Sequence, residues 1–206
     1  MSYSTITYNL TGGIATITLN RPEVMNALST LLRRELLEAL LRAQTEARVM
    51  VLTGTGRAFC SGQDLQDAGK IGSFELERIL NEEYVPMIKA ITDSPIPTIA
   101  AVNGAAAGAG ANLALAADSV IAAESASFIQ AFTRIGLVPD AGGSYWLPRQ
   151  IGLARSMGAM LLGDKITARQ AADWGMIYDC VPDAEFAANV QARAAQLATG
   201  PGVSYA

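Results

Sequence analysis

AAVNGAAAGAGANLALAADSVIAAESASFIQAFTRIGLVPDAGGSYWLPR (Ala100–Arg149) is the stretch around which the rest of the chain is organised. Its apolar start predicts a strand that ends at Val102 and meets the Asn103-Gly104 turn. A tract of Gly and Ala over residues 105–111 follows, and a helical pattern continues to Ala117. Glycine lets the backbone approach a ligand closely, and the first amides of a helix have no partner inside it. We interpret this strand-to-helix junction as a place where backbone N–H groups can bind an anionic oxygen.

The same stretch places one carboxylate, Asp140, at the entry of a second helical segment, in the sequence Val-Pro-Asp-Ala-Gly-Gly of residues 138–143. We interpret Asp140 as a general base beside the oxyanion site. A second interpretation also stands, because an aspartate at a helix start commonly caps the first amides. A Gly and Ala tract is equally expected where two helices cross tightly. The sequence alone leaves both alternatives open.

Composition excludes several classes of function. The 206 residues are half apolar, which suffices for one sizeable core. The formal net charge is −4 and the 15 Lys and Arg are scattered, so no nucleic-acid partner is expected. Cys60 and Cys180 lie far apart without CxxC spacing, which indicates neither a zinc site nor a disulfide and favours a cytoplasmic protein. The chain lacks histidine, so catalysis must rely on carboxylates, Tyr, Lys, Cys or backbone donors.

The sequence shows neither a signal peptide at its N-terminus nor an apolar run of about 18 residues that would cross a membrane. We therefore expect no contact with a membrane. No metal ligand set is predicted either, because the histidine and cysteine spacings of such sites are missing.

Strands alternate with helices along the chain, which predicts an α/β fold. A hairpin is expected over residues 4–19, and Ser29 is the predicted N-cap of the helix that follows. Residues 67–73 look like a mobile linker. Residues 57–65 form a second candidate binding loop, although an ordinary glycine turn is the alternative. Further strands are expected at residues 48–52, 98–102, 119–122, 126–129 and 177–181, and helices at 74–91, 141–151, 153–162, 167–175 and 183–198. Asp183 is the predicted cap of the last helix.

Six motifs, taken in order, resemble those of the enoyl-CoA hydratase/isomerase family, which has the crotonase fold. They cover about residues 5–182 and are Leu19–Pro22 with Asn26–Leu28, Phe59–Leu65, Asn103–Gly110, Ala117-Asp118, Gly136–Gly143 and Ala171–Ile177. The resemblance implies a ClpP-like α/β fold of repeated ββα turns with C-terminal helices. It assigns residues 1–182 to the crotonase core, and residues 183–206 to the start of a C-terminal helical part that is truncated relative to other members.

The resemblance also implies an acyl-CoA thioester as substrate, with no cofactor other than the CoA that the substrate carries. A homotrimer or a dimer of trimers is the expected assembly. The oxyanion donors would be the N–H groups of Gln63 and Ala109, and Asp140 stands where double-bond isomerases of the family have their carboxylate. One preset donor of this kind contributes roughly 3–4 kcal/mol when charge builds on a carbonyl oxygen.

Hydratases of the family carry two glutamates, and here those positions hold Asn112 and Phe132. Hydration needs one group to activate water and another to deliver a proton, whereas one carboxylate can remove a proton and return it elsewhere. The surviving residues therefore favour isomerisation. The segments around the site look most like those of the family's ring-opening isomerases, which act on the epoxide of phenylacetyl-CoA.

The residues expected to contact the substrate combine the oxyanion loop, the apolar acyl surface and the CoA channel. Arg21 is expected near a CoA phosphate, although it could equally well solvate the end of its strand. The full set is Arg21, Val24, Ser61, Gln63, Asp64, Leu65, Ala109 and Phe132.

Two other functions stay open. One is an enoyl-CoA hydratase in which Asp140 activates water by itself. The other is a protein without catalytic activity that binds CoA esters or serves as an assembly subunit.

Overall fold

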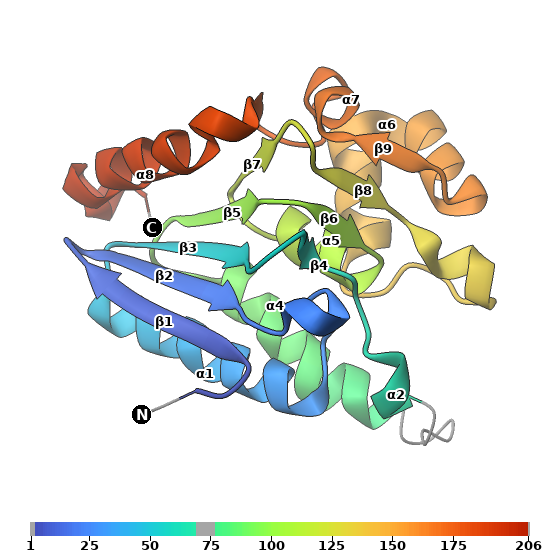
Figure 1. Cartoon of the computed structure of the whole chain (residues 1–206), viewed down its shortest axis with the longest axis horizontal. Helices are drawn as coiled ribbons and strands as arrows, with labels where there is room; N and C mark the ends of the chain where they lie inside the picture. Colours follow the sequence, from blue (N-terminus) through green and yellow to red (C-terminus); the bar gives the residue numbers. More distant parts are fainter. Residues whose placement is uncertain (1–2, 69–76, 206) are drawn as a thin grey trace.

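The computed structural model describes residues 3–68 and 77–205, and two sheets form its centre (Figure 1). The larger sheet has the order β1 (Ile6–Thr11), β2 (Ile14–Leu19), β3 (Val49–Gly54), β5 (Thr98–Val102), β7 (Ser119–Ala123) and β10 (Asp179–Val181). The smaller sheet has the order β4 (Ala58–Cys60), β6 (Ala105–Ala107), β8 (Ser127–Ile129) and β9 (Lys165–Thr167).

Helices surround these sheets in the described part of the chain. The α-helices are α1 (Thr30–Glu46), α2 (Leu65–Ala68), α4 (Val85–Thr92), α5 (Ala109–Leu115), α6 (Gly143–Leu162), α7 (Ala168–Asp173) and α8 (Asp183–Thr199). The 3-10 helices are η1 (Pro22–Val24), η3 (Ala131–Ile135) and η4 (Gly202–Ser204), and η2 (Leu80–Tyr84) is a π-helix.

The predicted opening hairpin and the crossover after it are confirmed. β1 pairs antiparallel with β2, and β2 pairs parallel with β3 after the chain has passed through α1. Ser29 caps α1 as expected, because its hydroxyl accepts a hydrogen bond from the Leu32 amide at 3.3 Å.

The predicted α/β class with repeated ββα turns is also confirmed. The pairs β3–β4, β5–β6 and β7–β8 each give one strand to each sheet, and a helix follows each pair. β4, β6 and β8 run parallel, so the segments after β4 and β6 leave the small sheet at the same edge. This repetition brings the loop after Cys60 beside the start of α5.

Different helices pack on the two faces of the large sheet. The alternating side chains of β3 point Val49 and Val51 toward α8, where Val190, Ala194 and Ala198 pack against them. The opposite face packs on α1 and α4, which Figure 1 shows on the other side of the sheet from α8. α8 therefore shares a core with the sheet.

Some element boundaries differ from the expectations. α5 ends at Leu115 instead of Ala117. The break predicted between 141–151 and 153–162 is confirmed, because Gly152 inside α6 has a non-helical φ of 76°. Asp183 was expected to cap α8 but is its first helical residue, and its carboxylate accepts a hydrogen bond from the Ser125 amide at 3.0 Å. The predicted linker and the start of the helix expected at 74–91 include residues 69–76, which lie outside the described residues.

Candidate active site

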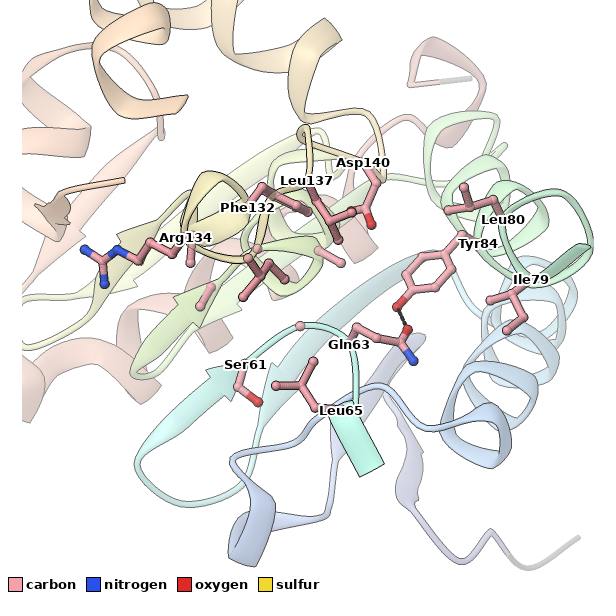
Figure 2. Close-up of a pocket in the computed structure, with 16 residues that line it drawn as sticks. Ser61, Gln63, Leu65, Ile79, Leu80, Tyr84, Phe132, Arg134, Leu137 and Asp140 are labelled. Atoms are coloured by element: carbon pink, nitrogen blue, oxygen red, sulfur yellow. Dashed lines mark hydrogen bonds between the residues drawn. The ribbon is translucent and has the colours of Figure 1, made fainter. Parts of the chain in front are cut away.

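A cavity of about 490 Å³ opens where the loop after β4, the start of α5 and the segment before α6 meet (Figure 2). Most of its wall is apolar. The residues that line it are Ser61, Gly62, Gln63, Leu65, Ile79, Leu80, Tyr84, Ala107, Gly108, Ala109, Ala131, Phe132, Arg134, Ile135, Leu137 and Asp140. The cavity therefore brings together the three residues expected to carry catalysis, Gln63, Ala109 and Asp140.

The direction of the Gln63 amide is set by the hydrogen bonds that Leu28 makes with the residues on either side of it. The Leu28 amide donates to the Gly62 carbonyl at 2.8 Å, and the Asp64 amide donates to the Leu28 carbonyl at 3.3 Å. In such a parallel bridge the residue in the middle, Gln63, turns its own N–H away from the partner segment. Among the described residues, no acceptor receives a hydrogen bond from this amide.

Ala109 is the first residue of α5, so its amide has no acceptor inside the helix. A Cβ atom placed on Gly62 would lie 3.3 Å from the Ala109 nitrogen and 2.8 Å from the Ala107 carbonyl oxygen. The two backbone segments are thus in contact, and the φ of +89° at Gly62 is one that favours glycine. Two amides side by side at a cavity wall can hold one anionic oxygen.

Asp140 supplies a carboxylate to the same cavity. Its backbone carbonyl accepts hydrogen bonds from Asn112 Nδ2 at 2.8 Å and from the Gly143 amide at 2.9 Å, which fix the loop. Its Oδ1 atom is buried and has no hydrogen-bond partner among the described residues. Burial therefore raises the pKa of this carboxyl from 3.8 to about 6. The capping alternative is wrong, because Gly142 is the N-cap of α6.

Tyr84 and Arg33 were not found from the sequence. The Tyr84 hydroxyl donates to Gln63 Oε1 at 2.5 Å, as Figure 2 shows, and its ring forms part of the cavity wall. Burial raises the pKa of this phenol, and the charge of Asp140 adds to the shift. Arg33 lies behind Gln63 and donates to the same Oε1 at 3.1 Å. The only sequence signal for Arg33 was its place as a charged residue beside the apolar face of α1.

The expected substrate contacts divide into two groups. Ser61, Leu65 and Phe132 line the cavity, whereas Arg21, Val24 and Asp64 do not. Arg21 Nη1 donates to the Ala27 carbonyl at 2.7 Å and to Asp64 Oδ2 at 2.8 Å. Burial of Asp64 opposes ionisation, but the hydrogen bond from Arg21 holds the pKa of that carboxyl below its usual value. A contact between Arg21 and a CoA phosphate stays a prediction.

The two positions at which the resemblance expects glutamates in a hydratase have other contacts here, and of the two only Phe132 lines the cavity. Asn112 is fully buried, and its Oδ1 accepts a hydrogen bond from Gln130 Nε2 at 2.8 Å while its Nδ2 holds the Asp140 carbonyl. Phe132 supplies apolar wall. Asp140 is thus the one carboxylate that lines the cavity in the described part of the chain. Over the same residues, no group of three His, Cys, Asp or Glu side chains is placed to hold a metal ion.

Two neighbouring amides, a largely buried carboxylate and an apolar cavity form an arrangement that can stabilise charge on a carbonyl oxygen. The sequence profile of the family described as enoyl-CoA hydratase/isomerase matches residues 9–206. The chain belongs to this family, whose enzymes act on acyl-CoA thioesters, and its fold is the crotonase fold.

Within residues 3–68 and 77–205, no helix is long and apolar enough to cross a membrane.

Similar proteins include both isomerases and hydratases. A Rhodobacter capsulatus protein named "Probable enoyl-CoA hydratase" is 61% identical over 100% of this chain and 80% of its own. The 1,2-epoxyphenylacetyl-CoA isomerase of Escherichia coli is 45% identical over 92% of this chain and 74% of its own. The crystal structure of an enoyl-CoA hydratase from Bacillus anthracis has a TM-score of 0.93 at 32% identity, covering 98% of this chain and 80% of that one.

Proposed function

We propose that this protein is an acyl-CoA isomerase in which Asp140 moves a single proton. The observation that carries the proposal is that Asp140 is the one carboxylate at the cavity among the described residues. Asp140 removes a proton from the carbon next to the thioester, and the electron pair moves onto the carbonyl oxygen between the Gln63 and Ala109 amides. The same carboxyl then returns the proton to another carbon, so no atom is gained or lost and no further cofactor is required.

The substrate that we propose is the epoxide of phenylacetyl-CoA, 2-(1,2-epoxy-1,2-dihydrophenyl)acetyl-CoA. In this substrate the bond between the two epoxide carbons breaks, which expands the ring to a seven-membered oxepin, and Asp140 moves the proton from the side-chain carbon next to the thioester to a ring carbon. The E. coli relative is named for this activity, and the apolar wall formed by Leu80, Phe132, Ile135 and Leu137 suits a ring. Ionisation of Asp140 suits the reaction as well, since a carboxyl with a pKa of about 6 is a stronger base than an ordinary aspartate and is still ionised at pH 7.

The test replaces Asp140 with Asn. This variant keeps the shape of the side chain, so it should retain the fold and the binding of CoA esters while turnover falls by about 10²–10⁴-fold. Turnover is followed by chromatography and mass spectrometry of the CoA ester. Unchanged turnover in Asp140→Asn would remove Asp140 from the reaction, and failure of the wild-type protein to bind acetyl-CoA up to millimolar concentration would contradict the substrate class.

Hydration is the second candidate, because the relative at 61% identity is named a probable enoyl-CoA hydratase. In that reaction Asp140 would activate water without the second carboxylate. Incubation with crotonyl-CoA in heavy-oxygen water separates the two candidates. Rapid incorporation of label into a hydroxyacyl product supports hydration, whereas bond migration without label supports isomerisation.

The expected homotrimer or dimer of trimers is likewise a proposal. Its support is the family resemblance together with exposed apolar side chains on α6, where Leu153, Met157 and Leu161 follow one another at helical spacing. Light scattering coupled to size-exclusion chromatography measures the assembly directly. A monomer at micromolar concentration would contradict it.

A further inference from the structure

Arg33 is a charged residue whose side chain is completely buried beside the active site. Its guanidinium makes an ion pair with Glu83, at 2.8 Å from Nε and 2.7 Å from Nη2. It also lies 5.1 Å from the centroid of the Tyr84 ring. A buried ion pair contributes little net stability, because desolvation offsets the attraction, and apolar residues of similar size often do as well. The stability of the fold therefore does not explain why an arginine stands here.

Apart from a hydrogen bond from Nη2 to Thr30 Oγ1 at 3.1 Å, the other side-chain contacts of Arg33 reach Gln63 and the segment that pairs with its loop. Nη1 donates to Gln63 Oε1 at 3.1 Å and to the Leu28 carbonyl at 2.5 Å. The Leu28 carbonyl also receives the Asp64 amide, one of the two hydrogen bonds that orient Gln63. Arg33 thus holds Gln63 through its side chain and, by way of Leu28, through its backbone.

Tyr84, whose ring lies against Arg33, contacts the same side chain of Gln63. Its hydroxyl donates to Gln63 Oε1, and Figure 2 shows the ring between Gln63 and Asp140. Gln63 Nε2 donates to the Asp64 carbonyl at 3.3 Å, so both polar atoms of the side chain have partners. Tyr84 belongs to the π-helix η2, a type of helix often found at functional sites. Three segments of the chain therefore meet at the side chain of one residue.

We propose that Arg33, together with Tyr84, is a positioning residue that fixes the Gln63 amide in the oxyanion site. The proposal rests on the proposed function, since it needs the thioester oxygen to lie at this amide. In this proposal the Gln63 side chain does not act on the substrate. Its hydrogen bonds with Arg33 and Tyr84 fix the position of the loop after β4, which carries the Gln63 amide. A donor that is set in advance stabilises the developing charge without reorganising, and a misplacement of about 1 Å can reduce the rate about 100-fold.

Three variants test the proposal. Gln63→Met keeps the backbone amide but removes both acceptor contacts, and it leaves the ion pair of Arg33 with Glu83 intact. Tyr84→Phe removes only the hydroxyl, and Arg33→Met removes the guanidinium. The matched control is Arg42→Met, because Arg42 also pairs with a glutamate, Glu46, and lies over a tyrosine ring on the surface away from the cavity.

Two readouts distinguish positioning from a structural role. The first is the division between kcat and KM in the isomerase assay. The second is the absorption band of bound trans-cinnamoyl-CoA, a conjugated thioester that absorbs at longer wavelength when its carbonyl oxygen accepts hydrogen bonds. The spectra are recorded in the Asp140→Asn background, so that proton transfer does not consume the ligand.

We expect Gln63→Met and Arg33→Met to lower kcat by about 10–100-fold with KM changed less than about threefold. Tyr84→Phe should lower kcat by about 3–10-fold, the value of one hydrogen bond. The red shift of the bound ligand should shrink in the same order, while Arg42→Met leaves both readouts unchanged.

Wild-type kcat and an unchanged red shift in Gln63→Met and Tyr84→Phe would overturn the proposal, even if Arg33→Met fails to fold. The failure of the proposed function looks different. In that case Asp140→Asn keeps the wild-type turnover, or the Asp140→Asn protein with Arg33 in place already shows no red shift, which removes the oxyanion site itself.

Discussion

Replacement of Asp140 by Asn should make the protein more stable at neutral pH while it abolishes most activity. Burial raises the pKa of the Asp140 carboxyl to about 6, so ionising this group costs more in the folded chain than in the unfolded chain. A raised carboxyl pKa contributes stability that is present below the unfolded value of 3.8 and is lost as the pH rises through the folded value. Asn carries no charge at any pH and is free of this cost.

The magnitude follows from the shift of about two pKa units, each of which corresponds to about 1.4 kcal/mol. Above pH 7 ionised Asp140 should therefore cost about 2–3 kcal/mol of folding free energy. At pH 4.5 most of the folded molecules keep the proton, and the cost falls to about 1 kcal/mol. The difference in unfolding free energy between Asp140→Asn and wild type should grow by about 2 kcal/mol between pH 4.5 and pH 7.5.

Urea unfolding followed by circular dichroism at several pH values measures this difference. Effects of all other titrating groups cancel between the two proteins, and any fixed effect of the amide side chain shifts every point equally. A difference that stays constant or shrinks as the pH rises would refute the reasoning, because it would mean that Asp140 is solvated in the folded protein. A wild-type titration of the carboxyl near pH 4 by NMR would lead to the same conclusion.

Four further outcomes are expected. The kcat/KM of the wild type should fall tenfold per pH unit below about pH 6 as Asp140 is protonated, and a limb that stays flat down to pH 4.5 would contradict its function as base. Gly62→Ala should lower kcat at least about 100-fold, since its Cβ would lie 2.8 Å from the Ala107 carbonyl oxygen at a φ of +89°; wild-type kinetics would disprove the close approach. Asn112→Ala should lower the unfolding free energy in urea by about 2 kcal/mol, because it removes the side-chain donor to the Asp140 carbonyl, and no loss would contradict this function. Arg21→Ala should weaken the binding of a CoA ester by about 1 kcal/mol, and more at low salt than at high salt; identical dissociation constants would remove Arg21 from the CoA site.

Much of the fold was predictable because its signals are local. The opening hairpin, the Ser29 cap and the break in α6 at Gly152 each depend on residues that are neighbours in the sequence. The division of the strands between two sheets could not be derived in this way. β4, β6 and β8 have three residues each, too few to show an alternating pattern, and only the resemblance to a family indicated the ββα repeat.

The residues of the candidate site likewise divide into those with a local sequence signal and those without one. Gln63, Ala109 and Asp140 lie in motifs of unusual composition and were predicted to lie at the site. Arg33 and Tyr84 lie in helices, and their contacts with Gln63, 30 and 21 positions away, connect them to the site. For Asp183 the local signal led to a wrong prediction. Its type suggested a cap, but its carboxylate accepts a hydrogen bond from the distant Ser125 amide instead.

The structure confirms tight packing at the Gly and Ala tract, and this packing is compatible with the anion site, which stays a prediction. A Cβ atom on Gly110 would overlap the carbonyl oxygen of Cys60. Residue 110 therefore has to lack a side chain for α5 to pack against β4. That approach is also what brings the Ala109 nitrogen beside Gly62 and hence beside the next amide along the loop. Packing without the amides would need only one small residue at the contact. Packing leaves unexplained why the Gln63 amide, which has no acceptor among the described residues, and the first amide of α5 meet at a cavity that also holds the Asp140 carboxylate. This arrangement is the reason to propose a thioester oxygen at this point.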